Sequence, residues 1–178
     1  MNKFLNKKSS RGFTLVEMLI YLAILVVVSI LVVGSVVMMM RAFNRIRVAR
    51  MVDDSAKLVM ERLVNEIRYA TSTDTGAGQS SFDSHPGKLV INTADRVTEN
   101  PTAIEFSLSG STLRIKEGAQ AYQDLTPPNI EITNLVFRRI ALPSAEEAVK
   151  IEMTIKGTRG TYEKIGNFYD TVVLRGSY

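Results

Sequence analysis

The sequence predicts an α+β fold in which one long N-terminal helix packs on an antiparallel β-sheet domain. Three observations support this class. The 23 residues from Met18 to Met40 contain no charged side chain, and the residues after them place apolar side chains at helical spacing. From residue 71 onward, short strand-like segments alternate with turn-forming residues. A chain of 178 residues is expected to form one modest domain beyond the apolar segment.

Residues 13–40 are predicted to form a membrane-spanning helix. The uncharged stretch would be roughly 35 Å long as a helix, slightly more than the ~30 Å hydrocarbon core of a bilayer. Its many Val and Ile residues would favour a strand in water, but a lone strand in lipid would leave its peptide groups unpaired. A secretory signal peptide is the competing interpretation. Its apolar region would be shorter, about 7 to 15 residues, and would not be followed at once by Arg41, Arg45, Arg47 and Arg50.

Residues 41–70 are predicted to continue this helix as an amphipathic segment. No proline occurs between residues 13 and 70, so a single helix of about 58 residues is allowed. The apolar stripe must pack on something in water, and the β-rich domain is its expected partner. The stripe consists of Val52, Ala56, Val59, Leu63 and Ile67, and the opposite, charged face is expected to hold Asp54, Lys57, Glu61, Arg62, Asn65, Glu66 and Arg68.

Residues 71–178 are predicted to form a β-rich globular domain. Residues 71–87 are mostly small polar and turn-forming, so the helix is expected to end there. Apolar residues alternate along 104–108 and 149–155, which is typical of half-buried antiparallel strands. The predicted strands are 88–92, 103–108, 112–116, 130–142, 148–156 and about 162–174, with turns at Asn100-Pro101, Ser109-Gly110, Pro127-Pro128 and Gly157 to Gly160.

The composition argues against several functional classes. Without cysteine the chain has no disulfide framework, no Cys-ligated metal and no thiol nucleophile. The single histidine, His85, is expected to be exposed in a loop, and no catalytic, phosphate-binding or metal-ligating motif is present. No catalytic residue, metal site or cofactor is therefore predicted, and the protein is not expected to be an enzyme.

The charge pattern argues against nucleic acid as a partner. The formal net charge of +4 is matched by four basic residues in the first twelve, Lys3, Lys7, Lys8 and Arg11. Residues 51–178 carry fourteen basic and seventeen acidic side chains, so the domain in water is slightly acidic. A surface that grips DNA would be basic, so no nucleic-acid binding is predicted.

A motif with ordered positions lies at the start of the apolar helix. Residues 8–17 read Lys-Ser-Ser-Arg-Gly-Phe-Thr-Leu-Val-Glu, so a short basic leader ends at Gly12 and Glu17 is the fifth residue counted from Phe13. This arrangement resembles the type IV prepilins over about the first 40 residues. The resemblance implies that a prepilin peptidase removes the leader, residues 1–12, by cutting between Gly12 and Phe13, and then methylates the new Phe13 amine. A signal anchor that merely begins Gly-Phe is the competing interpretation.

The resemblance also implies a location. The chain would sit in the inner (cytoplasmic) membrane with a single pass, its N-terminus cytoplasmic and its C-terminal domain outside, and would then enter an extracytoplasmic filament. The overall fold would be pilin-like.

Glu17 is an ionisable residue inside an apolar segment, which costs free energy and usually serves a purpose. The nearest basic residues, Lys8 and Arg11, would be lost with the leader. In related pilins the partner is the N-terminal amine of the neighbouring subunit, so the resemblance implies that Glu17 acts in assembly. The alternative is that Glu17 reaches the interface and remains hydrated.

Gly34 lies where many relatives carry a helix-breaking proline. Glycine is a weaker breaker, at about 1 kcal/mol relative to alanine. Together with Ser29 and Ser35 it forms a small-residue patch that either loosens when subunits pack or lets neighbouring helices come close. Close packing is the favoured interpretation.

The downstream sequence suggests a subtype. Residues 61–70 and the segment 132–139 resemble the J-type minor pseudopilins of type II secretion and related minor pilins, although the tryptophan that such relatives often carry is absent. These subunits are thought to join the initiating complex at a filament tip. The expected function is a structural subunit whose partners are other pilin or pseudopilin subunits, the prepilin peptidase and an assembly-platform membrane protein. The competing hypothesis is a single-pass membrane-anchored β-domain that binds a partner and never polymerises.

Overall fold

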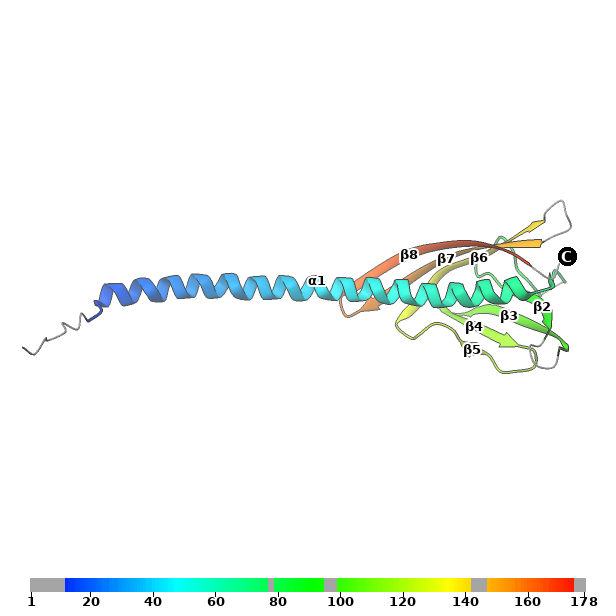
Figure 1. The fold of residues 1–178 in the computed structure, drawn as a ribbon, viewed down its shortest axis with the longest axis horizontal. Coiled ribbons are helices and arrows are strands. Elements are labelled where there is room, and N and C mark those ends of the chain that lie inside the picture. The colour runs from blue at the N-terminus through cyan, green and yellow to red at the C-terminus, as the bar shows by residue number, and fades with distance from the viewer. Residues whose placement is uncertain (1–11, 77–78, 95–98, 142–146, 175–178) are drawn as a thin grey trace, which may run out of the picture. The chain divides into compact units, whose positions relative to one another are not determined.

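The computed structural model describes residues 12–76, 79–94, 99–141 and 147–174. The chain divides into two compact units, Met1–Phe43 and Asn44–Tyr178. One helix, α1 (Leu15–Tyr69), belongs to both units, and the named strands belong to the second (Figure 1). They are β1 (Ser72–Thr73), β2 (Leu89–Ala94), β3 (Pro101–Ser109), β4 (Thr112–Glu117), β5 (Gln123–Asp124), β6 (Ile130–Ala141), β7 (Glu147–Arg159) and β8 (Tyr162–Val173).

The strands form two antiparallel sheets, which confirms the predicted α+β class. The first has the order β1-β2-β3-β4-β5 and the second the order β6-β7-β8. They separate because the segment between β4 and β6 turns at Gly118, which has a positive φ of 53°, and later passes through Pro127 and Pro128, which lack a backbone donor. One backbone hydrogen bond still joins the sheets, from Ile132 N–H to the Ser111 carbonyl at 2.8 Å.

The second half of α1 supplies one wall of the core, as its apolar spacing predicts. All five residues of the predicted stripe, from Val52 to Ile67, are at most 1% exposed. They pack with the inward residues of both sheets, including Phe106, Phe137 and Ile151. The predicted alternation at 149–155 is likewise confirmed, because Val149, Ile151, Met153 and Ile155 are all buried. The helix and the sheets therefore share one hydrophobic core.

Gly157 lies within β7, although it was expected to open a turn. The turn comes later, at Gly160, whose φ is +60°. A Cβ on Gly157 would lie only 2.4 Å from Cγ2 of Val52, because α1 and β7 approach each other closely at this point. The glycine in this strand thus reflects helix–sheet packing rather than a bend.

Glu66 is the one residue of the expected charged face that is buried, at 4% exposed, so its predicted exposure is wrong. Its Oε1 lies 3.1 Å from a guanidinium nitrogen of Arg62, which also contacts Glu117 on β4 at 2.6 Å. A carboxylate can be buried when a cation compensates it, and the residue that does so here lies one helical turn away. The two-residue strands β1 and β5 were also not predicted, since strands this short carry no periodic signal.

Candidate functional site

The helix of the first unit begins one residue after Thr14. The Oγ1 atom of Thr14 accepts a hydrogen bond from the Glu17 N–H at 3.2 Å, and its carbonyl accepts one from Met18 N–H at 3.2 Å. Thr14 is therefore the N-cap residue, and Glu17 stands at the third helical position, the spacing of a capping box. Phe13 was expected to be the first helical residue, but it precedes the N-cap. The Glu17 N–H has no carbonyl acceptor within the helix, and the Thr14 hydroxyl takes the place of that acceptor.

Glu17 has a partner within its own helix that the sequence analysis missed. The hydroxyl of Tyr21 donates a hydrogen bond to Oε1 of Glu17 at 3.3 Å, one turn further along. The Tyr21 ring also packs edge-to-face with the Phe13 ring, with ring centroids 6.2 Å apart and an interplanar angle of 77°. The i, i+4 spacing of Glu17 and Tyr21 was a visible signal for this contact. Phe13, Glu17 and Tyr21 thus form one local cluster at the start of the apolar helix.

The Gly12–Phe13 peptide bond lies in an open position. Both residues are exposed, and a Cβ built on Gly12 would have no heavy atom within 4 Å. No described side chain therefore blocks approach to this bond. The structure places Gly12, Phe13 and Glu17 close together along the chain, and all three precede the residues that line the hollows between α1 and β8.

The small-residue patch lies inside the continuous helix. The hydroxyl of Ser29 donates to the Leu25 carbonyl at 2.8 Å, so its polar group is satisfied within α1. Gly34 has open space around it, and α1 continues through Gly34 and Ser35 without a break. Gly34 therefore does not break the helix.

The apolar side chains of this segment face outward. In the part of the chain that the structure describes, one helix is long and apolar enough to cross a membrane. Its most apolar 18-residue window has a mean hydropathy of 3.0 and no buried residue. Large side chains such as Leu25, Ile30 and Val33 are more than half exposed. Such a surface is stable only in lipid or against other apolar helices.

Four arginines follow the apolar stretch at its C-terminal end. Arg41, Arg45, Arg47 and Arg50 are all exposed, and no acidic residue lies between Glu17 and Asp53. A helix whose uncharged apolar run is followed at once by several basic side chains is typical of the boundary between hydrocarbon and the headgroup layer.

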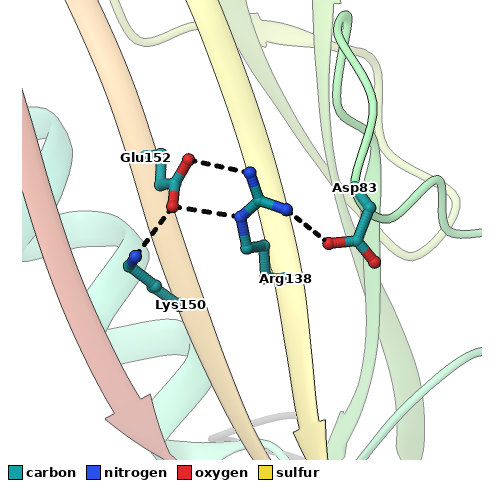
Figure 2. Close-up of polar contacts among 4 residues, drawn as sticks. All are labelled: Asp83, Arg138, Lys150 and Glu152. Atoms are coloured by element: carbon teal, nitrogen blue, oxygen red, sulfur yellow. Dashed lines mark hydrogen bonds and ion pairs between the residues drawn. The ribbon is translucent and has the colours of Figure 1, made fainter.

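A cluster of four charged side chains lies on the outer face of the three-stranded sheet (Figure 2). Arg138 on β6 contacts Glu152 on β7 at 3.0 Å and Asp83 in the preceding loop at 2.9 Å, and Lys150 contacts Glu152 at 2.8 Å. Hydrogen bonds from Arg138 and then from Lys150 lower the pKa of Glu152 to about 2. Bonds to Glu152 and Asp83 raise the pKa of Arg138. Each of the four charged side chains has an oppositely charged partner. Through Asp83, the cluster joins the loop before β2 to strands β6 and β7.

A second cluster ties the start of the β domain to the end of β6. Burial alone would raise the pKa of Glu147, but hydrogen bonds from the Thr73 backbone and hydroxyl and from Arg139 outweigh it and lower the pKa. Both Thr73 bonds reach Oε2 at 2.9 Å, while Arg139 contacts Oε1. Both oxygens of this carboxylate accept hydrogen bonds from the protein, which is typical of a structural group and not of a reactive one.

His85 lies exposed in its loop, as predicted, and its Nδ1 accepts a hydrogen bond from the Leu135 N–H at 3.1 Å. Among the described residues, no three His, Cys, Asp or Glu side chains gather in a way that could hold a metal ion. The features that stand out chemically are therefore the capped, apolar N-terminal helix and the change to basic side chains that follows it at Arg41.

Comparison with known proteins points to the same N-terminal part of the chain. Residues 7–40 match the model of the prokaryotic N-terminal methylation motif. No curated protein and no solved structure gives a match. The chain therefore has a type IV prepilin-like N-terminus followed by a long apolar helix, and its α+β architecture is consistent with a pilin-like fold. Proteins with this motif are structural subunits, processed by a prepilin peptidase and anchored through the apolar helix.

Proposed function

We propose that this chain is a structural subunit of a type IV filament or of a type II secretion pseudopilus. The observation that carries the proposal is the exposed apolar helix that starts directly after an accessible Gly12–Phe13 bond and a methylation motif. The chain acts as a building block and not as an enzyme. Residues 1–12 are the leader, 13–40 the segment for membrane and filament core, 41–70 the amphipathic continuation and 71–178 the globular domain.

Processing is the first step of the proposed function. The peptidase uses water to hydrolyse the bond between the Gly12 carbonyl carbon and the Phe13 nitrogen. A methyl group is then transferred from a bound methyl donor to the freed Phe13 amine, which loses a proton. Glycine at the cut lets the peptidase approach the backbone closely. The leader stays in the cytoplasm and the globular domain lies outside the inner membrane, where the subunit meets the assembly platform.

Assembly is the second step, and Glu17 acts in it. A carboxylate has about four acceptor sites, so the hydrogen bond from Tyr21 leaves the others available to a second subunit. The methylated Phe13 amine of that subunit pairs with Glu17 in low dielectric and fixes the axial register. The patch of Ser29, Gly34 and Ser35 then lets neighbouring helices pack closely, since no side chain stands over Gly34.

The downstream resemblance favours a minor subunit of the J type, placed in the initiating complex at the filament tip. Its support is the sequence of residues 61–70 and 132–139, which contain the end of α1 at Tyr69 and most of β6. A minor subunit would be scarce relative to the main subunit in purified filaments and would be needed for filament initiation.

The test measures the intact mass and the N-terminal sequence of the membrane-extracted protein, expressed with and without a prepilin peptidase. The expected result is a peptidase-dependent start at N-methylated Phe13. An uncut chain, or a cut elsewhere, would contradict the proposal and would leave a membrane-anchored binding domain as the better account.

Assembly is tested by substitutions at Glu17 and Tyr21. Glu17→Ala and Glu17→Gln should both be cleaved normally but be lost from filaments, because each removes the charge. Tyr21→Phe is the matched control, since it removes the hydrogen bond and keeps the carboxylate, and it should be incorporated. Normal incorporation of Glu17→Gln would exclude a role for the charge.

A further inference from the structure

An open hollow of about 560 Å³ lies between α1 and the start of β8. It is lined by Arg45, Ile46 and Ala49 of the helix and by residues 161–164 of the strand and the turn before it. Its volume is within the range of pockets that hold small molecules. All of these residues belong to the second unit, so the hollow does not depend on how the two units are arranged.

The face of β8 that is turned to the helix carries Lys164. A Cβ on Gly166 would lie 3.5 Å from Cγ1 of Val52 on α1, so this face of the strand is the one next to the helix. Side chains alternate along a strand, so Lys164 shares this face and Glu163 is on the other. The carboxylate of Glu163, whose residue also lines the hollow, lies 3.1 Å from Nζ of Lys156 on β7. This acidic group is therefore already paired, away from the helix.

Arg45 and Lys164 give the hollow its charge. Both are exposed, and within the described ranges neither forms an ion pair with an acidic side chain. The next acidic residue along α1 is Asp53, eight positions and about 12 Å beyond Arg45. Thr161 and Tyr162 add hydroxyl groups to the lining residues. An anion that accepts hydrogen bonds and carries an apolar part suits this combination.

The hollow begins close to the membrane, because Arg45 is the fifth residue after the uncharged run ends at Met40. Five residues of helix rise about 7.5 Å, and no conformation of the chain can separate these two residues by more than about 18 Å. The headgroup layer on each side of a bilayer is about 5 to 8 Å thick. The chain itself therefore keeps Arg45 at or close to this layer. Lipid phosphates are the anions that membrane anchoring brings to the hollow.

We infer that this hollow binds the headgroup of an anionic phospholipid. The guanidinium of Arg45 and the ammonium of Lys164 contact the phosphate, while Ile46 and Ala49 contact the apolar part next to it. A zwitterionic lipid is a poorer ligand, because its own cation competes for the same phosphate. Binding fixes the turn between β7 and β8 to the membrane surface. The inference depends on membrane anchoring and goes beyond the proposed role in a filament.

The test uses the unprocessed full-length protein in micelles of an uncharged maltoside detergent and follows its backbone amides by NMR. Three probes are added in turn. They are dihexanoyl phosphatidylglycerol, which is anionic, dihexanoyl phosphatidylcholine, which is zwitterionic, and inorganic phosphate, which has no apolar part. Phosphatidylglycerol should shift the amide signals of Ala49, Thr161 and Lys164 to saturation. Its apparent affinity should be roughly tenfold or more above that of either other probe.

Arg45→Gln and Arg47→Gln form a matched pair of variants. Each removes one positive charge from an exposed position of the same helix, but the two side chains point about 200° apart around its axis and only Arg45 lines the hollow. Arg45→Gln and Lys164→Gln should each weaken binding of phosphatidylglycerol roughly tenfold, whereas Arg47→Gln should weaken it less than about twofold. Circular dichroism confirms that each variant is folded.

Four results would overturn the inference. They are the absence of a saturable shift with phosphatidylglycerol, an equal response to phosphatidylcholine, an equal response to inorganic phosphate, and equal weakening by Arg45→Gln and Arg47→Gln. The last of these would mean attraction by the whole basic segment and not by the hollow. Failure of the proposed function is seen separately, as the absence of processing at Phe13, and does not alter the lipid titration of the uncut chain.

Discussion

Substitution of Gly157 by alanine tests the close approach of α1 to β7 at Val52. The new Cβ would lie 2.4 Å from Val52 Cγ2 and 3.2 Å from Ile130 Cδ1. Carbon atoms in contact normally stay about 3.5 to 4.0 Å apart, so helix or strand must move by roughly 1 Å. Val52 is fully buried and β-branched, so it has little freedom to turn away.

The expected cost follows from two opposing effects. Overpacking a core costs about 1 to 3 kcal/mol, and alanine recovers about 0.4 to 1 kcal/mol by restricting the unfolded chain. The net loss in the free energy of unfolding should be about 1 to 2 kcal/mol. With a slope of about 1 to 3 kcal/mol per molar, the midpoint of urea unfolding should fall by roughly 0.5 to 1 M. Tyrosine fluorescence of the full chain in micelles reports this transition, since the chain has no tryptophan.

A double-mutant cycle decides whether the contact with Val52 is the cause. Val52→Ala alone should destabilise the domain, but less so in the Gly157→Ala background, with a coupling of about 1 kcal/mol. Gly166→Ala is the matched control on the neighbouring strand, because its Cβ would come close only to the far edge of the Phe168 ring, at 2.9 Å, and would make an ordinary contact of 3.5 Å with Val52 Cγ1. If Gly157→Ala leaves the midpoint unchanged, or the two substitutions are simply additive, the close-contact argument is refuted.

Three further outcomes are expected. The lowered pKa of Glu152 contributes stability that is complete above its unfolded pKa of about 4.3 and is lost as pH falls through about 2. The protection of the Asp83 backbone amide from hydrogen exchange should therefore fall across this pH range. Glu152→Gln should remove that pH dependence. Thr14→Ala should cost the N-terminal turn about 1 kcal/mol and speed amide exchange at Glu17 several-fold, whereas Thr14→Ser should not. Leu63→Ala, at a side chain with no exposed surface, should lower the free energy of unfolding by about 3 kcal/mol in urea, and unchanged stability would contradict its place in the core.

Much of the fold could be predicted from the sequence because its signals are periodic. The spacing of Val52, Ala56 and Leu63 places all three side chains on one face of a helix, and that face is buried. The alternation from Val149 to Ile155 likewise places the apolar side chains on one buried face of a sheet. These patterns depend on local geometry, which the sequence displays directly. The division into two sheets depends instead on which strands meet after the turn at Pro127, and a linear pattern does not contain that information.

The individual errors share a physical cause, since each depends on a contact made outside the pattern. Glu66 was placed on the charged face because its type is polar, but the ion pair with Arg62 allows its burial. Gly157 was assigned to a turn because of its residue type. Glycine is needed there because Val52, on α1, comes too close for a Cβ, and the linear sequence does not show this contact. At the candidate site, the motif through Gly12 and Phe13 was readable, while the Thr14 cap and the Tyr21 hydroxyl required the positions of side chains.

The loop around Asp83 and His85 covers part of the outer edge of β6, because Asp83 N–H donates to the Phe137 carbonyl and His85 accepts from Leu135 N–H. This covering has a consequence for the order of folding. The residues that cover β6, around His85 and Asp83, precede their partners on β6 by 50 and 55 positions in the chain. Synthesis and export proceed from the N-terminus, so this loop is already present when β6 emerges. β6, β7 and β8 then join sequence neighbours, which is fast because the contacts are local. The nascent domain therefore exposes its β6 edge only briefly, and the time available for wrong strand pairing there is short.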